Sequence, residues 1–489
     1  DWNVLAQSDL AGQRIVGLID FGDVMKTITV ADAAIAAAYA AMGKSDPVKT
    51  IANVVAGFHS ELPLQDEEIE VVYDLVLIRL TTSACLSAKS QLANPEDEYL
   101  KLHFQPSLDL LEILVKESPS LVECKIRAAC GLEPWKDSAA VCAYLSSIET
   151  ANVVGVDLNR EGFHVIDLTP GSFQMADTTK PDTFAEKERG WGIGRYREPR
   201  LIYASESFEG ESERRTIHMG LDIGGPEGTP VFAPLDGVVI SVVDNGQNLD
   251  YGPTVILEHE TPEGIKFATL YGHMNRKTLT IRKPGERVKK GDLIAEFGGE
   301  DINGGWPPHL HLQILPSFFR EIDSSGNFPG VVAPSEEILW ASVCPDPNLL
   351  TKLPPEQASL QKTDSSELSA RRKATMSQAQ SVAYSDPLHI VTGKGQHLYD
   401  AQGRAYLDCV NNVCHVGHCH PKIVEAGQRQ MSVLNTNTRY LHQRILDYTE
   451  RLLDKFPKEL DTAFLVCSGS EANELALRLS RAYTERHNV

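Results

Sequence analysis

Several side chains of the kinds that bind zinc or move protons lie in one part of the sequence. His218 and Asp222 form an H-x3-D pair, and His309 and His311 form an H-x-H pair further along the chain. His273 lies between the two pairs, in a Tyr-Gly-His sequence. A hydrolytic zinc ion needs three protein ligands and one open position, and imidazole nitrogens with one carboxylate oxygen suit it. The sequence therefore predicts a zinc site made of the H-x3-D pair and one histidine of the H-x-H pair.

The H-x-H pair can serve two purposes if it lies on a β-strand. Side chains alternate along a strand with period two, so His309 and His311 would point to the same face. One ring can then bind the metal while its neighbour stays free to transfer a proton. A single histidine is usually an ordinary surface or core residue. Four histidines, each in a distinct local context, favour a metal centre instead.

The local contexts of these residues resemble lysostaphin- or LytM-type zinc metallopeptidases over roughly residues 205–345. This resemblance implies that His218, Asp222 and His311 bind zinc, and that His273 and His309 are the catalytic histidines. At such a centre the pKa of water is lowered, one histidine takes the proton, and the other stabilises the oxyanion of the attacked amide. The motifs that carry the resemblance are His218-Met-Gly-Leu-Asp222, Gly228-Thr-Pro-Val, Leu270-Tyr-Gly-His273 and Pro308-His309-Leu-His311.

A different reading of the same stretch is a biotinyl or lipoyl carrier domain. Val231-Phe-Ala-Pro-Leu-Asp-Gly and Gly285-Glu-Arg-Val-Lys-Lys-Gly resemble the two halves of such a domain, because both folds join short strands through glycine-rich turns. A carrier needs one lysine at a hairpin tip beside a small residue or methionine, and no such tetrapeptide lies between the halves. This alternative is therefore less favoured.

Composition restricts the partners and the compartment. The 489 residues include 46 Lys plus Arg and 67 Asp plus Glu, and a net charge of -21 repels phosphate backbones, so we expect no nucleic-acid partner. The longest apolar stretch, around Ala31 to Met42, is too short to cross a bilayer, and no signal peptide is recognised. Nine cysteines without C-x-x-C spacing favour reduced thiols. We expect a cytoplasmic protein with no membrane partner.

The first 150 residues predict a second kind of site. From Ala31 to Leu145 apolar residues recur at spacings of three and four, which indicates an α-helical lobe. A β-branched strand before it ends in Ile19-Asp20-Phe-Gly-Asp23, and carboxylates at such a strand end commonly hold Mg²⁺ on a nucleotide. Together with Asn3, this segment resembles aminoglycoside phosphotransferase-like small-molecule kinases. The resemblance implies that Asn3 and Asp20 bind the Mg²⁺ of ATP, with the catalytic base and the nucleotide-binding lobe expected before residue 1.

The last part of the chain predicts a third site. Ser468-Gly469-Ser470-Glu-Ala-Asn473 follows a buried-strand pattern at 462–467 and opens a helix, whose N-terminal N–H groups suit a phosphate. This region resembles the N-terminal part of class III pyridoxal-phosphate aminotransferases. The resemblance implies that Gly469 and Ser470 hold the phosphate of pyridoxal phosphate, that the Schiff-base lysine comes later in the chain, and that the enzyme is a homodimer.

We therefore predict a multidomain α and β protein. It has an α-helical kinase C-lobe at residues 1–150, a connector at 151–204, an all-β peptidase sandwich or barrel at 205–345, a linker at 346–380, and the start of an α/β pyridoxal-phosphate transferase of fold type I at 381–489. In the connector, alternating glycines at 190, 192 and 194 do not form a phosphate loop, because no strand leads into them and no Lys-Ser/Thr follows.

The predicted function is zinc-dependent peptide-bond hydrolysis by the central domain, combined with small-molecule kinase and transaminase modules. The substrates would be peptides or small amino compounds. The alternative is an amino-acid or amino-alcohol metabolic enzyme, a phosphotransferase joined to an aminotransferase or phospho-lyase. In that enzyme the β domain would be a spacer or binding module without catalysis.

Overall fold

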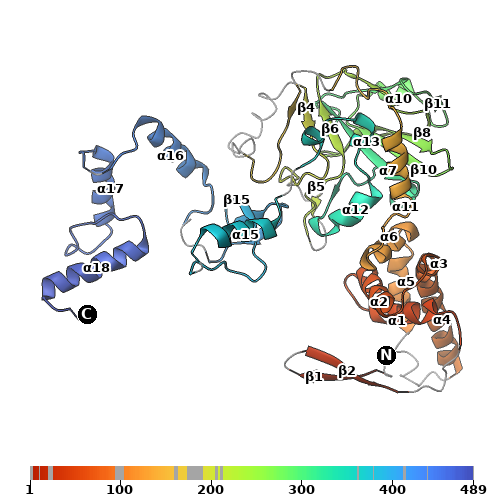
Figure 1. The fold of residues 1–489 in the computed structure, drawn as a ribbon, viewed down its shortest axis with the longest axis horizontal. Coiled ribbons are helices and arrows are strands. Elements are labelled where there is room, and N and C mark those ends of the chain that lie inside the picture. Colours follow the sequence, from red (N-terminus) through yellow and green to blue (C-terminus); the bar gives the residue numbers. More distant parts are fainter. Residues whose placement is uncertain are drawn as a thin grey trace. The chain divides into compact units, whose positions relative to one another are not determined.

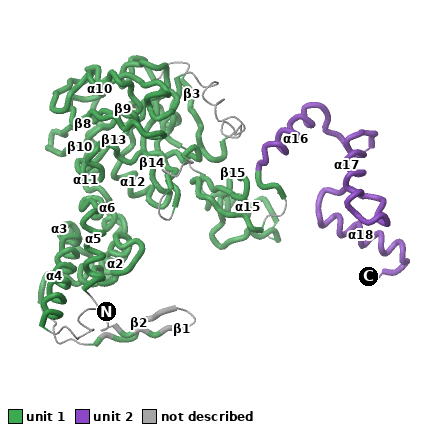
Figure 2. The backbone as a smooth tube through the Cα atoms, turned by 180° about the vertical axis from the view of Figure 1, so that it is seen from behind, with its two compact units in different colours: residues 1–418 green, residues 419–489 purple. Residues whose placement is uncertain are grey.

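The computed structural model forms two compact units, residues 1–418 and residues 419–489 (Figures 1 and 2). Asn3 and Asp20 lie outside the described residues, so the Mg²⁺ site stays a prediction. The structure describes residues 4–9, 12–19, 26–93, 104–158, 163–172, 191–203, 208–209, 213–360, 363–377, 379–410, 415–437 and 439–487.

The first part of unit 1 is a β-hairpin followed by helices. Strands β1 (Val4–Asp9) and β2 (Gly12–Leu18) pair antiparallel. The helical periodicity is confirmed, and buried alanines along the first helix let its neighbours approach closely. The helices are α1 (Val30–Ala41), α2 (Pro47–Glu61), α3 (Asp66–Glu70), α4 (Val72–Ala93), α5 (Phe104–Leu114), α6 (Pro119–Ala129) and α7 (Ser138–Ser147).

The central part of unit 1 is built on an eight-stranded sheet in the order β11-β8-β9-β10-β13-β6-β4-β3. All neighbours pair antiparallel except β3 and β4, which are parallel. The strands are β3 (His164–Val165), β4 (Gly192–Gly194), β6 (Leu221–Gly224), β8 (Gly237–Asn245), β9 (Gly252–Glu260), β10 (Lys266–Gly272), β11 (Arg287–Val288) and β13 (His309–Pro316).

Two smaller sheets and four short helices accompany the eight-stranded sheet. Strand β12 (Leu293–Glu296) pairs with β7 (Pro230–Phe232), and β14 (Val331–Val332) pairs with β5 (Ile217–His218). The helical pieces are α10 (Thr278–Ile281), α11 (Phe319–Ile322), the 3-10 helix η3 (Pro334–Glu336) and α12 (Glu337–Val343). Short strands joined by turns were the sequence signature of this region.

Strand β13 has two chemically different faces. Leu310, Leu312 and Ile314 are fully buried in the core, while His309, His311 and Gln313 alternate with them and face the other way. The pairing with β6 places His311 opposite Asp222. The predicted common face of the H-x-H pair is therefore confirmed, and the register brings a carboxylate beside it.

The segment between the helices and the β-rich part is more than a connector in the structure. Its residues 164–165 and 192–194 form β3 and β4, two strands of the main sheet. The alternating glycines make this possible, because a Cβ at Gly192 would lie 2.5 Å from the side chain of Ile166. The apolar alternation at 163–168 is typical of a strand and agrees with β3, whereas the stretch around β4 was too glycine-rich to predict a strand.

Helix α6 packs with two hydrophobic cores. Val122 and Ile126 belong to the core of the helical region, whereas Cys124 belongs to the core of the β-rich region, with Leu121 and Ala128 packed against that core. Residues three and four apart share one face of a helix, so α6 presents a different face to each core. The helical and β-rich parts of unit 1 are therefore joined by packed side chains and by more than chain connectivity.

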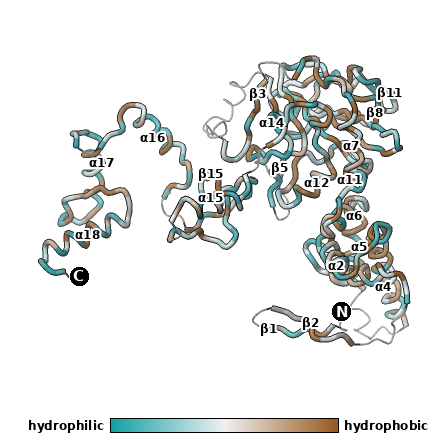
Figure 3. The backbone as a smooth tube through the Cα atoms, in the orientation of Figure 1, coloured by the Kyte–Doolittle hydropathy of each residue, from teal (hydrophilic) through white to brown (hydrophobic). Residues whose placement is uncertain are grey.

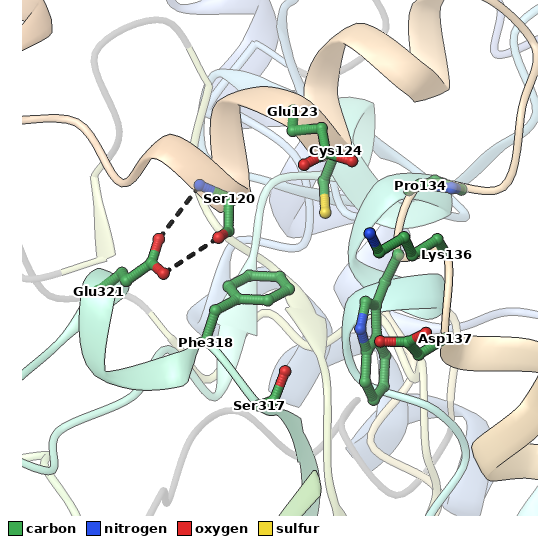
Figure 4. A pocket seen from close by; sticks show the side chains of 10 residues that line it. Ser120, Glu123, Cys124, Pro134, Lys136, Asp137, Ser317, Phe318 and Glu321 are labelled. Carbon is green, nitrogen blue, oxygen red and sulfur yellow. Dashed lines mark hydrogen bonds between the residues drawn. The ribbon is translucent and has the colours of Figure 1, made fainter. Parts of the chain in front are cut away.

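A pocket marks the same junction (Figure 4). Glu321 of α11 accepts hydrogen bonds from the backbone N–H and the hydroxyl of Ser120, at 3.1 and 3.0 Å, and so caps the first turn of α6 (Figure 4). Trp135 and Phe318 also meet there edge to face, with ring centroids 6.5 Å apart. Polar and aromatic contacts thus add to the shared packing of α6.

The stretch at 346–380, expected to be a linker, begins inside the β-rich core. Leu350, Leu353 and Ala358 are buried there, although the surrounding sequence is polar and proline-rich. The apolar residues were too sparse to signal packing. The stretch contains α13 (Asn348–Thr351), α14 (Pro355–Ala358) and the exposed α15 (Ser365–Thr375).

A hairpin follows the exposed helix α15 and forms the last two strands of a three-stranded sheet. Its turn runs from Asp400 to Gly403, and Gly403 has a φ of 82°, a value that favours glycine. Asp400 accepts hydrogen bonds from the backbone N–H groups of Gln402 and Arg404 at 2.9 Å. The strands are β15 (Ile390–Lys394), β16 (His397–Asp400) and β17 (Ala405–Leu407).

Unit 2 contains the helices α16 (Pro421–Val433), α17 (Gln443–Leu453) and α18 (Gly469–Thr484), none with a buried residue. The strand predicted at 462–467 is wrong, since these residues form no strand and Phe464 is exposed. A strand of this kind needs neighbouring strands for its N–H and C=O groups, and the described residues of unit 2 contain none. The hydrophobic residues between α17 and α18 are brown in Figure 3.

Stability of the β-rich part should depend on pH through His259. Burial lowers the pKa of this ring to about 4; its Nδ1 donates to the carbonyl of Asp236 at 2.9 Å. Because the unfolded value is about 6.5, the unfolded chain takes up a proton first as the pH falls. The contribution of His259 to the free energy of unfolding should be fully present above about pH 6.5 and should fall by roughly 3 kcal/mol towards pH 4.

Urea denaturation at several pH values tests this expectation. His259→Asn should make the loss of stability between about pH 6.5 and 4 smaller by the share of one histidine, whereas the exposed His487→Gln should leave it as in the parent protein. Equal slopes in the parent protein and in His259→Asn would contradict the assignment.

Candidate functional site

Three predicted ligands converge on one point of unit 1. Nε2 of His218 lies 2.9 Å from Nδ1 of His311, and Oδ1 of Asp222 lies 3.2 Å from each of these nitrogens. Asp222 comes from β6, His311 from the neighbouring strand β13, and His218 from β5. The convergence of residues about ninety positions apart in the sequence is thus a product of strand pairing.

The hydrogen-bond partners fix which ring atoms carry protons. Nδ1 of His218 faces the carbonyl of Arg195 at 3.3 Å, and Nε2 of His311 faces Oε1 of Gln313 at 3.0 Å. Both partners are acceptors, because the amide nitrogen of Gln313 donates to the carbonyl of Pro329. The outer nitrogens therefore carry the protons. The inner nitrogens and the Asp222 oxygen are then three lone-pair atoms facing one another, an arrangement that only a cation stabilises.

The size of this triangle fits zinc. Ligands about 2.0–2.1 Å from a tetrahedral zinc ion lie roughly 3.3 Å from one another. Burial, helped by the Arg200 charge, lowers the pKa of His218 to about 3. Burial alone would raise the pKa of Asp222, but the facing His218 ring and Arg200 hold it well below its usual range. At neutral pH the site therefore offers the neutral imidazole of His218 and the carboxylate of Asp222, the forms that bind metal.

His273 lies next to this triangle in a strained backbone conformation. Its φ is 67°, in the left-handed region, and backbone hydrogen bonds with Tyr251 and Gly298 hold it there at 2.7 and 2.9 Å. Its Nδ1 donates to the carbonyl of Asn303 at 2.8 Å, which leaves Nε2 without a proton in the neutral ring. Burial and the neighbouring His309 hold the pKa of His273 well below its ordinary value.

His309 stacks on His273 at the edge of the site. The ring centroids are 4.2 Å apart, and Nδ1 of His309 donates to the carbonyl of Pro307 at 2.6 Å. Its Nε2 lies 4.0 Å from the ligand oxygen of Asp222. The side chains of His309 and Asp222 are 15% and 14% exposed, against 2% for His218, so the site opens towards solvent on the His309 side. Burial also lowers the pKa of His309.

The structure therefore gathers all five residues predicted for the central domain into one site. Two supporting residues were missed from the sequence: Gln313, which accepts from His311, and Asn303, whose carbonyl accepts from His273. The alternation His309, His311, Gln313 along one strand face was a usable signal for the first. The second acts through its backbone, so its residue type carried no signal.

Gly220, inside the H-x3-D pair, must lack a side chain. A Cβ at this position would lie 2.3 Å from Cε1 and 2.5 Å from Nε2 of the His311 ring. We expect Gly220→Ala to displace that ligand and to weaken zinc binding by about 10- to 100-fold, measured by competition with a chelating dye. Gly57→Ala, in an open helical position with nothing within 4 Å, should leave zinc affinity unchanged. Full zinc affinity in Gly220→Ala would contradict the expectation.

The predicted phosphate site at 469–470 lies at the start of a helix, as expected. Ser468 is the N-cap of α18, and its side chain accepts from the backbone N–H of Glu471 at 3.2 Å. Gly469 and Ser470 form the first turn, where backbone N–H groups have no partner within the helix. These residues fit a phosphate group.

Comparisons with known proteins agree with two of the three predicted modules. The family described as Peptidase family M23 matches residues 216–321, and the family Aminotransferase class-III matches residues 379–489. An M23 peptidase domain and a class III aminotransferase domain are therefore present. M23 peptidases are zinc-dependent and class III aminotransferases use pyridoxal phosphate, which agrees with the His-Asp-His cluster and the predicted cofactors. Neither match covers residues 1–150, so the kinase interpretation stays a prediction.

Individual relatives match only parts of the chain. The Drosophila melanogaster protein "Alanine--glyoxylate aminotransferase 2-like" is 53% identical over 105 residues, 22% of this chain and 21% of its own length. The Caenorhabditis elegans "Ethanolamine-phosphate phospho-lyase homolog 1" is 43% identical over 124 residues, 25% of this chain and 26% of its own. The solved structure of a zinc-containing peptidase from Vibrio cholerae is 27% identical, covers 25% of this chain and 36% of that chain, and has a TM-score of 0.18.

The chain thus spans about a fifth to a quarter of the length of these curated relatives. Among the helices of the described ranges, none combines the length and the apolar composition that crossing a bilayer requires.

Proposed function

We propose that the central domain hydrolyses a peptide bond at a zinc ion held by His218, Asp222 and His311. The observation that carries the proposal is the convergence of three lone-pair atoms within 3.2 Å of one another, with two further unprotonated imidazole nitrogens beside them. When bound, zinc supplies Lewis-acid chemistry and lowers the pKa of water at the site. A lone structural zinc site would need a fourth protein ligand instead of an open corner.

The two remaining histidines, His273 and His309, are the groups that can take up a proton beside the metal site. In neutral form His273 and His309 each present Nε2 as an acceptor, because Nδ1 of each donates to a backbone carbonyl. Either ring can therefore take the proton of the attacking water. The oxyanion of the attacked amide needs a donor, which a histidine supplies at Nε2 only after it has gained a proton. The ring that takes the proton of the attacking water thereby gains a donor at Nε2, which can then stabilise the oxyanion.

Metal analysis and a peptide-cleavage assay on the full chain test this proposal. We expect one zinc per chain and cleavage of an unstructured peptide library, both lost after treatment with a chelator and restored by zinc. A protein that binds zinc with full occupancy yet cleaves no peptide in the library would favour the spacer interpretation. A folded protein that binds no zinc would contradict both the site and the function.

We also propose that residues 379–489 form part of an enzyme that uses pyridoxal phosphate on a small amino compound. The family match and the 53% identity to an aminotransferase relative favour this second function. The names of the relatives suggest two reactions, transfer of an amino group from alanine to glyoxylate and phosphate release from phosphoethanolamine. Assays of both reactions with the full-length protein and pyridoxal phosphate distinguish them, and absence of both would contradict the proposal.

A further inference from the structure

A row of charges, partly exposed at Asp167 and buried at Glu198 and Arg200, runs from the segment before the M23 match to the metal site. Arg195 contacts Asp167 at 2.6 Å and Glu198 at 2.7 Å. Arg200 then contacts Glu198 through Nε at 2.9 Å and Asp222 through Nη1 at 2.6 Å. Positive and negative groups alternate along the row, so every charge has an opposite neighbour.

The contact with Arg200 gives the two carboxylate oxygens of Asp222 different partners. Nη1 of Arg200 binds Oδ2, whereas Oδ1 faces the two ligand nitrogens of His218 and His311. A carboxylate held in this way can give only one oxygen to a metal. The guanidinium also withdraws negative charge from Asp222, which leaves more of the charge of a bound cation uncompensated.

Arg200 is held in place from several directions. Its side chain is 2% exposed, and that of Glu198 is fully buried. Its backbone N–H donates to the carbonyl of Thr216 at 2.8 Å, and Nη1 also donates to the hydroxyl of Tyr203 at 3.2 Å. Buried ion pairs are costly to form and costly to break, because removal of one partner leaves the other unpaired. These contacts therefore hold the Arg200 side chain in one position.

Strand β4 leaves the space that the guanidinium occupies. Gly194 lies opposite Asp222 in the pairing of β4 with β6, and a Cβ at Gly194 would lie 2.7 Å from Nη2 of Arg200. Among the described residues Nη2 has no hydrogen-bond partner, although it is buried. Three backbone contacts tie the segment 195–200 to β5, which carries His218, and to its preceding residue. The segment is therefore built around the metal site.

We propose that Arg200, oriented by Glu198, is a positioning residue that holds Asp222 as a single-oxygen metal ligand. Arg200 does not touch the metal or the substrate and acts only through Asp222. Residues 195–200 lie before the matched range 216–321, and they become part of the active site through this contact. The inference rests on the metal centre of the proposed function, and is independent of which bond the centre cleaves.

Cobalt substitution and zinc titration of the full chain test this role. In Arg200→Met, Asp222 is free to offer both oxygens, so the visible absorption of the Co²⁺-loaded protein should weaken as the coordination number rises. Zinc affinity should fall by about 10- to 100-fold. The matched control is Arg282→Met, which breaks ion pairs with Glu286 and Asp292 in the same β-rich part and leaves the contact between Arg200 and Asp222 intact. It should keep the parent cobalt spectrum and zinc affinity.

A double variant keeps the test informative if Arg200→Met does not fold. Arg200→Met leaves two buried carboxylates with fewer partners, and Glu198→Gln/Arg200→Met removes one of these charges. The double variant should fold and show the same cobalt and zinc changes. An unchanged spectrum and affinity in a folded Arg200 variant, or the same changes in Arg282→Met, would overturn the inference. Because both readouts are metal binding, absence of peptide cleavage would count against the proposed function alone.

Discussion

Asp222→Ala is expected to abolish zinc binding and to reduce kcat/KM for peptide cleavage by roughly 10³-fold or more. The variant removes the one anionic ligand, so two neutral imidazoles would have to hold a divalent cation. It also leaves the buried Arg200, whose guanidinium lies 2.6 Å from the lost carboxylate, without that partner. The positive charge then repels a cation from the same place. Metal content by mass spectrometry and cleavage rates at saturating zinc measure the two effects.

The control for this variant is Asp244→Ala, which removes an exposed carboxylate from β8 of the same sheet. It should keep full zinc content and the parent rate. Retention of one tightly bound zinc in Asp222→Ala would show that the metal lies elsewhere. Loss of zinc with unchanged cleavage would show that the reaction does not use this centre.

His309→Ala is expected to keep zinc and lose activity. Its ring is no ligand in the proposed set, since His218, Asp222 and His311 complete the triangle without it. A general acid–base residue contributes about 10²- to 10⁴-fold, and the loss should appear in kcat with little change in zinc affinity. His273→Ala should lower kcat similarly, but alanine keeps a Cβ at φ 67° and removes the hydrogen bond to the carbonyl of Asn303, so stability should fall as well.

The pH profile separates these roles. The reaction needs an unprotonated histidine, and burial lowers the pKa of both His273 and His309. In the parent protein kcat/KM should therefore stay high to below about pH 6.5, the ordinary value for histidine, and fall only at lower pH. Removal of either ring should change this acid limb. If both variants retain the parent rate and profile, neither histidine transfers a proton in the reaction.

Much of this site was predictable because its metal-binding and proton-transferring residues occur in short, recognisable sequence motifs. The H-x3-D and H-x-H spacings, with His273 in Tyr-Gly-His, named every residue that converges in the structure. The pairing of His311 with Asp222 also follows from strand alternation once the two strands are neighbours. Which strands would be neighbours was not in the pattern. That depends on long-range pairing, to which no local spacing is sensitive.

The supporting residues were less visible for a similar reason. Arg200 lies in a segment that reads as an irregular connector, and only the fold shows that it meets Asp222. The prediction of a strand at 462–467 was wrong because residues that favour β-structure form a strand only where a neighbouring strand pairs with them. Composition and periodicity describe what a segment is able to form. Partners elsewhere in the chain decide what it does form.

Helix α6 couples the unfolding of the helical part to that of the β-rich part. Val122 and Ile126 serve one core and Cys124 the other, so neither the helical nor the β-rich part keeps its packing if the other melts. Two domains joined by a linker alone could unfold independently, whereas here the side chains of α6 couple the two parts. Heating should therefore produce one cooperative endotherm for both parts. A protein shortened to residues 1–150, the predicted helical part, should be insoluble.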